Sequence, residues 1–368
     1  MNIYQVPWRL VLNKIVRYPG GRELDRFRGI FPGADDNRPE AWIGSDTRTV
    51  NALQKGDPND GCSECILPDG SRRYLFEVVN DCPEQALGQD HRAIHGDRIG
   101  LLVKLLDAQY QLGLQTHPTR PYAKKYFASD YGKEESWYVI GLRGDSSEPP
   151  YVLLGFKEGV TCRQFEDAFD AGDIAAMEAC CHKIQARVGD AFYIKAGAPH
   201  AIGCGCLVVE VQEPSDITVG ARKMAASTGE EQERHKQRLL GCYSYDGCDE
   251  RENRRRYLIE PQVIRAGDWG QEAVVISQGT AEHFSFTRLD ARLDVPLLRT
   301  GALQVVIVLQ GQGLMHCGDY DLDLKQGDEL FIPFAAEGIH VSPVNPGETL
   351  SLVLCNPEQT REKTHVSP

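Results

Sequence analysis

The sequence predicts a mainly β protein built from two jelly-roll barrels with a helical insertion. Short apolar runs such as QVVIVLQG and LSLVLCNP are separated by Gly and Asp turns, as is typical of all-β folds. One pattern occurs twice, from Gly189 to His200 and from Gly327 to His340: a Gly-Asp turn, an apolar run, a further Gly and a His. Apolar residues at helical spacing over 162–184 predict the insertion.

The first barrel is expected to take most of its strands from the first half of the chain. Extended segments are expected over residues 4–16, 38–46, 101–108, 135–142 and 151–156, and again from 191 through 200 to the alternating run LVVEVQE. The segment RELDRF after Pro19-Gly20-Gly21 predicts a short helix, residues 84–87 are expected to be helical, and a turn-like segment is expected after Pro118. Residues 55–72 are rich in Gly, Asp, Pro and Ser, which predicts a surface loop.

Lys104 lies inside the apolar run LLVKLLDA, where a lysine is rarely found without a partner. We expect it either to pair with a carboxylate such as Asp107 or Glu77 or to reach the substrate.

Composition and periodicity divide the chain into four parts. These are a first barrel over 1–156 and 186–221, a helical insertion over 157–185, a charged helix or loop connection over 222–256, and a degenerate C-terminal barrel over 257–368. The last part has no Gln-x-His pair upstream of its Gly-Asp turn and offers only His316 there. His340 is therefore interpreted as structural.

Composition also indicates which binding partners and which cellular compartment to expect. The formal net charge of −13 argues against nucleic acid and anionic membrane surfaces, which need a basic footprint. The chain has no apolar run of about 18 residues and no signal-peptide layout at its start, so a cytoplasmic protein is expected. The twelve cysteines are scattered, and for Cys62-x-x-Cys65 and Cys204-x-Cys206 packing is favoured over metal binding.

The most informative stretch is LQTHPTRPYAKKYFASDYGKEESW. Gln115 and His117 are two residues apart in an extended segment, so both side chains point to one face. Glu135 starts the next β-favouring run, and His200 ends the first Gly-Asp pattern. An isolated Gln-x-His pair is usually a polar pair at a strand edge that binds no metal. Together, the side chains of Gln115, His117, Glu135 and His200 predict a metal site. Two nitrogens and two oxygens suit zinc, and also iron, manganese or cobalt.

These residues resemble the type I mannose-6-phosphate isomerases, which are zinc-dependent cupins. The segments VKLLDAQYQLGLQTHP, YGKEESWYV, RVGDAFYIKAGAPHAI and LVVEVQEPSD occur in the family's order, with further echoes at PGGREL, EAWIGSD and GDELFIP. The resemblance implies that Gln115, His117, Glu135 and His200 bind one Zn²⁺ per chain. It implies a small sugar phosphate as substrate, interconversion of mannose-6-phosphate and fructose-6-phosphate through a cis-enediol, and a monomer or homodimer.

The catalytic residues implied are Lys133 and Arg222. Lys133 would place a cation beside the reacting atoms. The alternative interpretation is that Lys133 is exposed and forms an ion pair with Glu134 or Asp130. The family usually has Arg two residues beyond the Thr of S-D-x-T, where this chain has Gly220. Arg222 is the expected substitute. Asp216 stays a candidate base.

Two further hypotheses remain open on the sequence alone. One is an isomerase for another sugar or sugar phosphate, or a cupin oxygenase, although oxygenases more often use His-rich ligand sets. The other is a non-catalytic sugar-binding cupin, which Gly220 favours.

Overall fold

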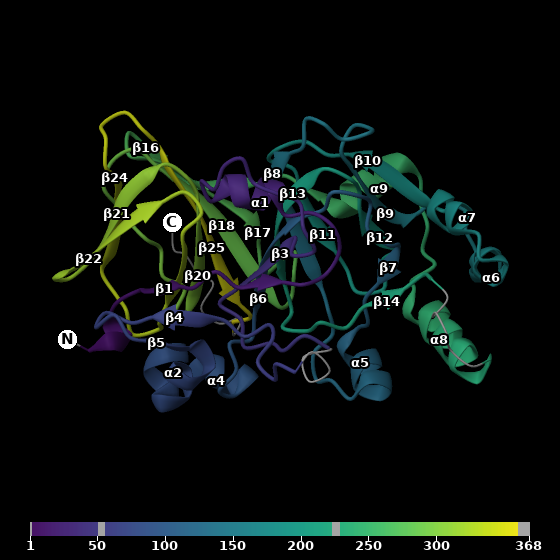
Figure 1. The fold of residues 1–368 in the computed structure, drawn as a ribbon, viewed down its shortest axis with the longest axis horizontal. Coiled ribbons are helices and arrows are strands. Elements are labelled where there is room, and N and C mark those ends of the chain that lie inside the picture. Colours follow the sequence, from purple (N-terminus) through teal and green to yellow (C-terminus); the bar gives the residue numbers. More distant parts are fainter. Residues whose placement is uncertain (1, 51–55, 223–228, 360–368) are drawn as a thin grey trace.

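The computed structural model describes residues 2–50, 56–222 and 229–359. Strands dominate and are arranged in four sheets within these ranges, with the helices outside the sheets (Figure 1). The prediction of a mainly β protein is confirmed. The ends of the predicted connection and of the C-terminal barrel, at 223–228 and 360–368, lie outside the described residues.

Two sheets enclose the part of the molecule that concerns function. The seven-stranded sheet has the order β15 (Leu258–Ile259), β11 (Ala191–Ile194), β8 (Glu135–Leu142), β13 (Cys206–Gln212), β6 (Leu102–Asp107), β3 (Glu40–Ile43) and β2 (Lys14–Ile15). The five-stranded sheet has the order β10 (Cys181–Gln185), β9 (Tyr151–Phe156), β12 (His200–Ile202), β7 (Gln115–Thr116) and β14 (Val219–Gly220). Their inner faces pack on each other through buried side chains that include Leu106, Val139, Val152, Leu154, Ile202 and Val208.

The other two sheets belong mainly to the C-terminal part. The nine-stranded sheet has the order β16 (Gln262–Gly267), β17 (Gly270–Ile276), β18 (Phe284–Ala291), β25 (Leu350–Pro357), β20 (Gln304–Gln310), β23 (Glu329–Ile332), β1 (Trp8–Leu10), β4 (Glu64–Ile66) and β5 (Arg72–Tyr74). The four-stranded sheet has the order β19 (Val295–Pro296), β24 (Ile339–Pro343), β21 (Gln312–Cys317) and β22 (Tyr320–Lys325). Strands from near the N-terminus thus complete a sheet of the C-terminal part.

The helices are short. They are η1 (Ile3–Gln5), α1 (Arg22–Phe27), α2 (Leu75–Asp81), α3 (Pro83–Leu87), α4 (Gln89–His95), α5 (Arg120–Phe127), α6 (Cys162–Ala171), α7 (Ile174–Ala179), α8 (Gly229–Cys242) and α9 (Glu250–Tyr257). The helix predicted for RELDRF is confirmed as α1. The predicted pair of inserted helices is confirmed as α6 and α7, which separate where Gly172 takes a positive φ of 70° and Asp173 caps the next helix.

Three local predictions are wrong. Residues 4–16 do not form one strand, because Pro7 has no N–H to donate and the segment splits into η1, β1 and β2. The segment after Pro118 is the helix α5, capped by the Thr119 side chain, and not a turn. Residues 55–72 are not loop throughout, since β4 pairs with β1 and β5.

Candidate active site

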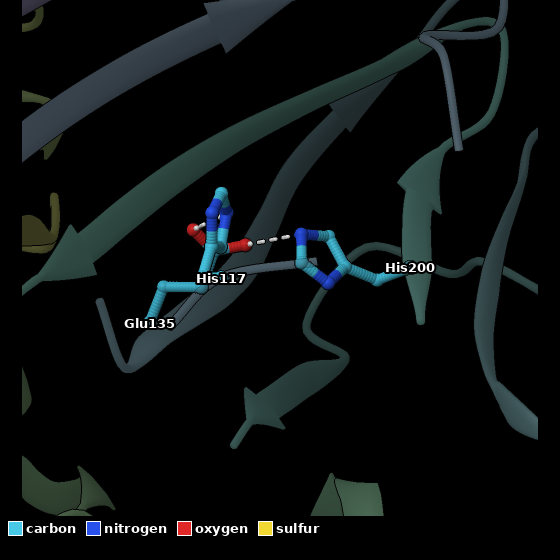
Figure 2. A group of neighbouring side chains, drawn as sticks. All are labelled: His117, Glu135 and His200. Carbon is cyan, nitrogen blue, oxygen red and sulfur yellow. Dashed lines mark ion pairs between the residues drawn. The ribbon is translucent and has the colours of Figure 1, made fainter. Parts of the chain in front are cut away.

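Three side chains of metal-ligand type meet between the five-stranded and seven-stranded sheets. His117 follows β7, Glu135 begins β8 and His200 begins β12. One nitrogen or oxygen of each lies within 4.8 Å of those of the other two, and all three residues are buried. Figure 2 shows dashed lines that join the Glu135 carboxylate to both imidazole rings. The fold therefore brings together residues that are far apart in the sequence, from His117 to His200.

The Glu135 carboxylate bridges the two histidines. Its Oε2 lies 3.2 Å from His117 Nε2, and its Oε1 lies 3.4 Å from His200 Nε2. Neither oxygen accepts a hydrogen bond of ordinary geometry from the described residues. Buried carboxylate oxygens are normally hydrogen-bonded or bound to a cation. Oε2 has the Lys133 ammonium group 3.2 Å away and Oε1 faces the His200 ring, and a carboxylate beside two imidazoles is a donor set that fits a metal ion.

The other nitrogen of each imidazole is fixed by the backbone. His117 Nδ1 donates to Ile217 O and His200 Nδ1 donates to Ala198 O, both at 2.9 Å. These bonds hold the proton on Nδ1 and direct the Nε2 lone pair toward Glu135. Metal-binding histidines are usually oriented in this way.

Burial and charge set the protonation of the three groups. Burial lowers the pKa of His117 well below its ordinary value, and burial also lowers the pKa of His200. Burial by itself would raise the pKa of Glu135, but the positive charge of Lys133 and other neighbours outweighs it, so this pKa lies below its ordinary value. Neutral imidazoles and an ionised carboxylate are the forms that bind a metal.

Gln115 joins this group from β7. It lies directly opposite His200 in the antiparallel register, and its Nε2 is 3.3 Å from His200 Nε2. A half-turn of the amide exchanges Nε2 for Oε1, which is the atom an amide offers to a metal. The structure thus brings all four nominated donors to one place.

Lys133 is buried beside the same atoms. Its Nζ lies 2.9 Å from His117 Nε2 and 3.2 Å from Glu135 Oε2. The alternative of an exposed ion pair with Glu134 or Asp130 is wrong, because the Lys133 side chain is only 4% exposed and its ion-pair partner is Glu135. Lys133 is therefore a cation inside the site.

A cavity of about 640 Å³ opens onto the cluster. Its lining includes four cations and four carboxylates, which are Arg17, Lys104, Lys133, Arg222, Glu40, Glu135, Glu210 and Asp216. A cavity of this size suits a small polar ligand.

Lys104 pairs with a carboxylate that the sequence analysis did not name. Its partner is Glu210, 3.2 Å away and directly opposite on β13, so the prediction of Asp107 or Glu77 is wrong. Asp107 instead binds the Arg143 guanidinium through both oxygens, at 2.8 and 2.6 Å. Lys104 also lies 5.1 Å from the centre of the Trp42 ring and lines the cavity.

Arg17 was missed by the sequence analysis. It forms an ion pair with Asp216 at 2.8 Å, and its guanidinium lies 5.5 Å from the centre of the Trp42 ring. Asp216 Oδ2 also accepts the Val50 N–H at 2.9 Å. The only signal in the sequence was the position of Arg17 just before PGGREL, one of the segments that carry the family resemblance.

Arg222 also lines the cavity. Its Nε and Cζ come within 3.6 and 3.9 Å of the position that a Cβ on Gly113 would take. Its guanidinium makes no hydrogen bond or ion pair with the residues that the structure describes, whereas Arg17, Lys104 and Lys133 each pair with a carboxylate. Within the ranges that the structure describes, Arg222 is therefore the lining cation without a carboxylate partner.

Gly220 leaves room beside the metal-ligand cluster. It lies directly opposite Gln115 on the edge strand β14. A Cβ added there would meet no atom within 4 Å. A long side chain at this position would therefore extend toward the cavity without a backbone clash.

The fold and this site define a mainly β protein with a buried His-Glu-His cluster in a polar cavity. The probable mannose-6-phosphate isomerase GmuF of Bacillus subtilis is 32% identical over 318 residues, which cover 79% of this chain and 89% of that protein. The mannose-6-phosphate isomerase of Streptococcus mutans is 28% identical over 283 residues, 72% of this chain and 79% of its own. No family model matches the chain.

Solved structures agree on the fold. The mannose 6-phosphate isomerase of Bacillus subtilis superposes with a TM-score of 0.72 at 21% identity, over 96% of this chain and all of that one. A zinc-bound mannose 6-phosphate isomerase superposes with a TM-score of 0.73 at 15% identity, over 96% and 99% of the two chains. The chain belongs to the mannose-6-phosphate isomerase family, and it is an isomerase. None of the helices described has both the length and the apolar character needed to span a bilayer.

Proposed function

We propose that this isomerase interconverts mannose-6-phosphate and fructose-6-phosphate, with one zinc ion bound by Gln115, His117, Glu135 and His200. The observation that carries the proposal is the convergence of these four donors on a cavity that is also lined by Arg222, which has no carboxylate partner among the residues described. Membership of the family supplies the substrate class.

The reaction moves a proton between C1 and C2 of the sugar, and its difficulty lies in the anionic cis-enediol. When bound, the zinc ion would supply a Lewis acid for the sugar oxygens. Lys133 would place a second positive charge beside the developing negative charge. The ion pairs of Lys104 with Glu210 and of Arg17 with Asp216 would form a rigid polar wall for the sugar hydroxyls.

Proton transfer needs a group within hydrogen-bond reach of both carbons. Glu135 and His200 are assigned to the metal, and Glu210 is paired with the buried Lys104. Asp216 lines the same cavity from the segment just before β14 and is also ion-paired, with Arg17. It remains the proposed base because its side chain is 12% exposed, against 5% for Glu210.

The phosphate would bind to Arg222. A guanidinium can contact two phosphate oxygens at once, and Arg222 has no carboxylate partner among the described residues. The open space at Gly220, next to Gln115, is consistent with Arg222 taking over from the family's usual arginine two positions earlier.

Replacing Arg222 by alanine should reduce kcat/KM for mannose-6-phosphate by about tenfold or more, because a charge-assisted contact is worth about 1.5 kcal/mol or more. Folding and zinc content should stay unchanged. The measurement is steady-state kinetics together with elemental analysis.

A second variant makes this prediction sharper. Since a Cβ at Gly220 would meet no atom within 4 Å, the double variant Gly220→Arg with Arg222→Ala should recover part of the lost kcat/KM. Arg238→Ala, on α8 outside the lining of this cavity, is the matched control and should change little. An unchanged kcat/KM in Arg222→Ala would remove this residue from the phosphate site.

The function itself is tested with purified, zinc-loaded protein in a coupled assay for fructose-6-phosphate. Mannose-6-phosphate should give product, while glucose-6-phosphate and free mannose should not. Turnover of another sugar in preference to mannose-6-phosphate would support the second candidate, an isomerase for a different sugar, which the glycine at position 220 favours. No turnover of any of them would favour the non-catalytic sugar-binding cupin.

We also propose the division of the chain into two jelly-roll barrels, over 1–156 with 186–221 and over 257–368, joined by the insertion at 157–185 and the connection at 222–256. The strands β1, β4 and β5 depart from this division, because they come from residues 1–156 and pair into the sheet of the second barrel. The facing five-stranded and seven-stranded sheets support the first barrel. A separate buried core between the nine-stranded and four-stranded sheets supports the second.

A further inference from the structure

The outer face of the four-stranded sheet carries a second pair of histidines. His316 on β21 and His340 on β24 are direct partners in the antiparallel register, so both side chains project from the same face. Their neighbours Met315 and Val341 are buried and point the other way. The pair is on the outside of the C-terminal part, and Figure 1 shows β21 and β24 at the end of the molecule away from β7 and β12.

Each of these histidines is held by its own aspartate. His316 Nδ1 donates to Asp321 Oδ1 at 2.7 Å, and His340 Nδ1 donates to Asp294 Oδ2 at 2.8 Å. Both bonds use Nδ1, so the lone pair of each ring is on Nε2. An imidazole backed in this way by a carboxylate is the usual form of a metal-binding histidine.

The positions of the aspartates decide where the Nε2 atoms point. Asp321 is on β22, on one side of the pair, and Asp294 precedes β19, on the other side. The two nitrogens of an imidazole flank Cε1, and their in-plane directions diverge. Because each Nδ1 faces a flanking strand, each Nε2 lies on the part of its ring away from that strand, on the side of the other histidine.

The charge and exposure of this face also favour a cation. The side chains of His316 and His340 are 37% and 43% exposed, so an ion can reach them from solvent. The same hairpin carries Asp323 two residues beyond Asp321, on the same face. Oxygen-preferring ions such as Mg²⁺ and Ca²⁺ gain little from imidazole, whereas Ni²⁺, Cu²⁺ and Zn²⁺ bind it well.

We propose that His316 and His340 form a bidentate site for a late first-row divalent metal ion, with Asp294 and Asp321 orienting the two rings. Water completes the coordination. This site is independent of the sugar-phosphate site and does not rest on the function proposed for it. Because Asp294 lies on the segment that leads into β19, an ion bound here ties together all four strands of the sheet.

The proposal is tested by titrating the metal-free full chain with Ni²⁺ and measuring the heat of binding by isothermal titration calorimetry. Wild-type protein should show a class of sites that His316→Ala and His340→Ala each weaken by tenfold or more. Asp294→Asn and Asp321→Asn should weaken it by about 10- to 100-fold, the range for residues that orient a metal ligand. Ser342→Ala, two residues from His340 on the same strand face, is the matched control and should leave the affinity unchanged.

Two outcomes separate this site from the sugar-phosphate site. His117→Ala should keep the class of sites that depends on His316 and His340, and these outer variants should keep isomerase activity, which also reports that they fold. Identical Ni²⁺ titrations for wild type, His316→Ala and His340→Ala would overturn the proposal. So would loss of all Ni²⁺ binding in His117→Ala.

Discussion

Replacing His117 by alanine should reduce the metal content from about one ion per chain to a trace, and isomerase activity should fall with it. The imidazole is buried, its Nε2 lies 3.2 Å from Glu135 Oε2, and its Nδ1 is fixed on Ile217 O. Removing it deletes one of four donors and also the ring that holds Glu135 from one side. Elemental analysis after exhaustive dialysis at low free zinc gives the metal content, and the coupled assay gives the activity.

The matched control is His340→Ala, which removes a histidine of the other Gly-Asp pattern. This variant should keep the ion that supports activity, because His340 is on the outer face of a different sheet. The reverse result, with zinc and activity lost in His340→Ala and kept in His117→Ala, would put the catalytic metal in the C-terminal part. Dialysis against a chelator should abolish wild-type activity, and zinc should restore it.

Local spacing accounts for the parts of this site that could be predicted from the sequence. Gln115 and His117 are two residues apart, and so are Lys133 and Glu135, so each pair shares a face whatever the rest of the chain does. Local spacing does not determine which strand faces meet in the folded protein. The family resemblance supplied that information, and the structure brings the two pairs together with His200 across two sheets.

The parts that could not be predicted depend on partners that are distant in sequence. Lys104 was expected to pair with a carboxylate nearby in the chain, but its partner Glu210 is brought opposite by antiparallel pairing of β6 and β13. Arg17 reaches Asp216 through a similar long-range contact. Side-chain periodicity carries no register between strands, so neither pair has a signature in the sequence.

The segment after Pro118 shows a different limit. Its residues RPYAKKYF have no strong apolar stripe and follow a proline, which favours a turn interpretation. The structure forms α5 there, because Thr119 caps the helix and Pro121 falls in its first turn, where a missing N–H costs nothing. The sequence therefore contained a helix-capping signal, Thr119, but the preceding Pro118 favoured the turn interpretation.

Replacing Lys133 by alanine should leave zinc in place and reduce turnover by on the order of a hundredfold or more, about 2.7 kcal/mol of lost transition-state stabilisation. The ammonium group carries its protons and cannot bind a metal, so it is not one of the ligands. It lies 2.9 Å from His117 Nε2 and 3.2 Å from Glu135 Oε2, which puts its charge within reach of any sugar oxygen at the cluster. The measurement is kcat for mannose-6-phosphate beside zinc content.

Two further variants separate a catalytic role from a structural one. Lys133→Met keeps the apolar stem that fills the buried space and removes only the charge, so it should lose turnover to the same extent as Lys133→Ala. Lys124→Ala is the matched control, because Lys124 lies in the same stretch of chain but is 77% exposed and pairs with the exposed Asp130. Its turnover should be that of the wild type. If zinc is lost in parallel with turnover in Lys133→Met, Lys133 holds the ligands in place and does not act on the transition state, because its charge would then be needed to keep Glu135 ionised in its buried position.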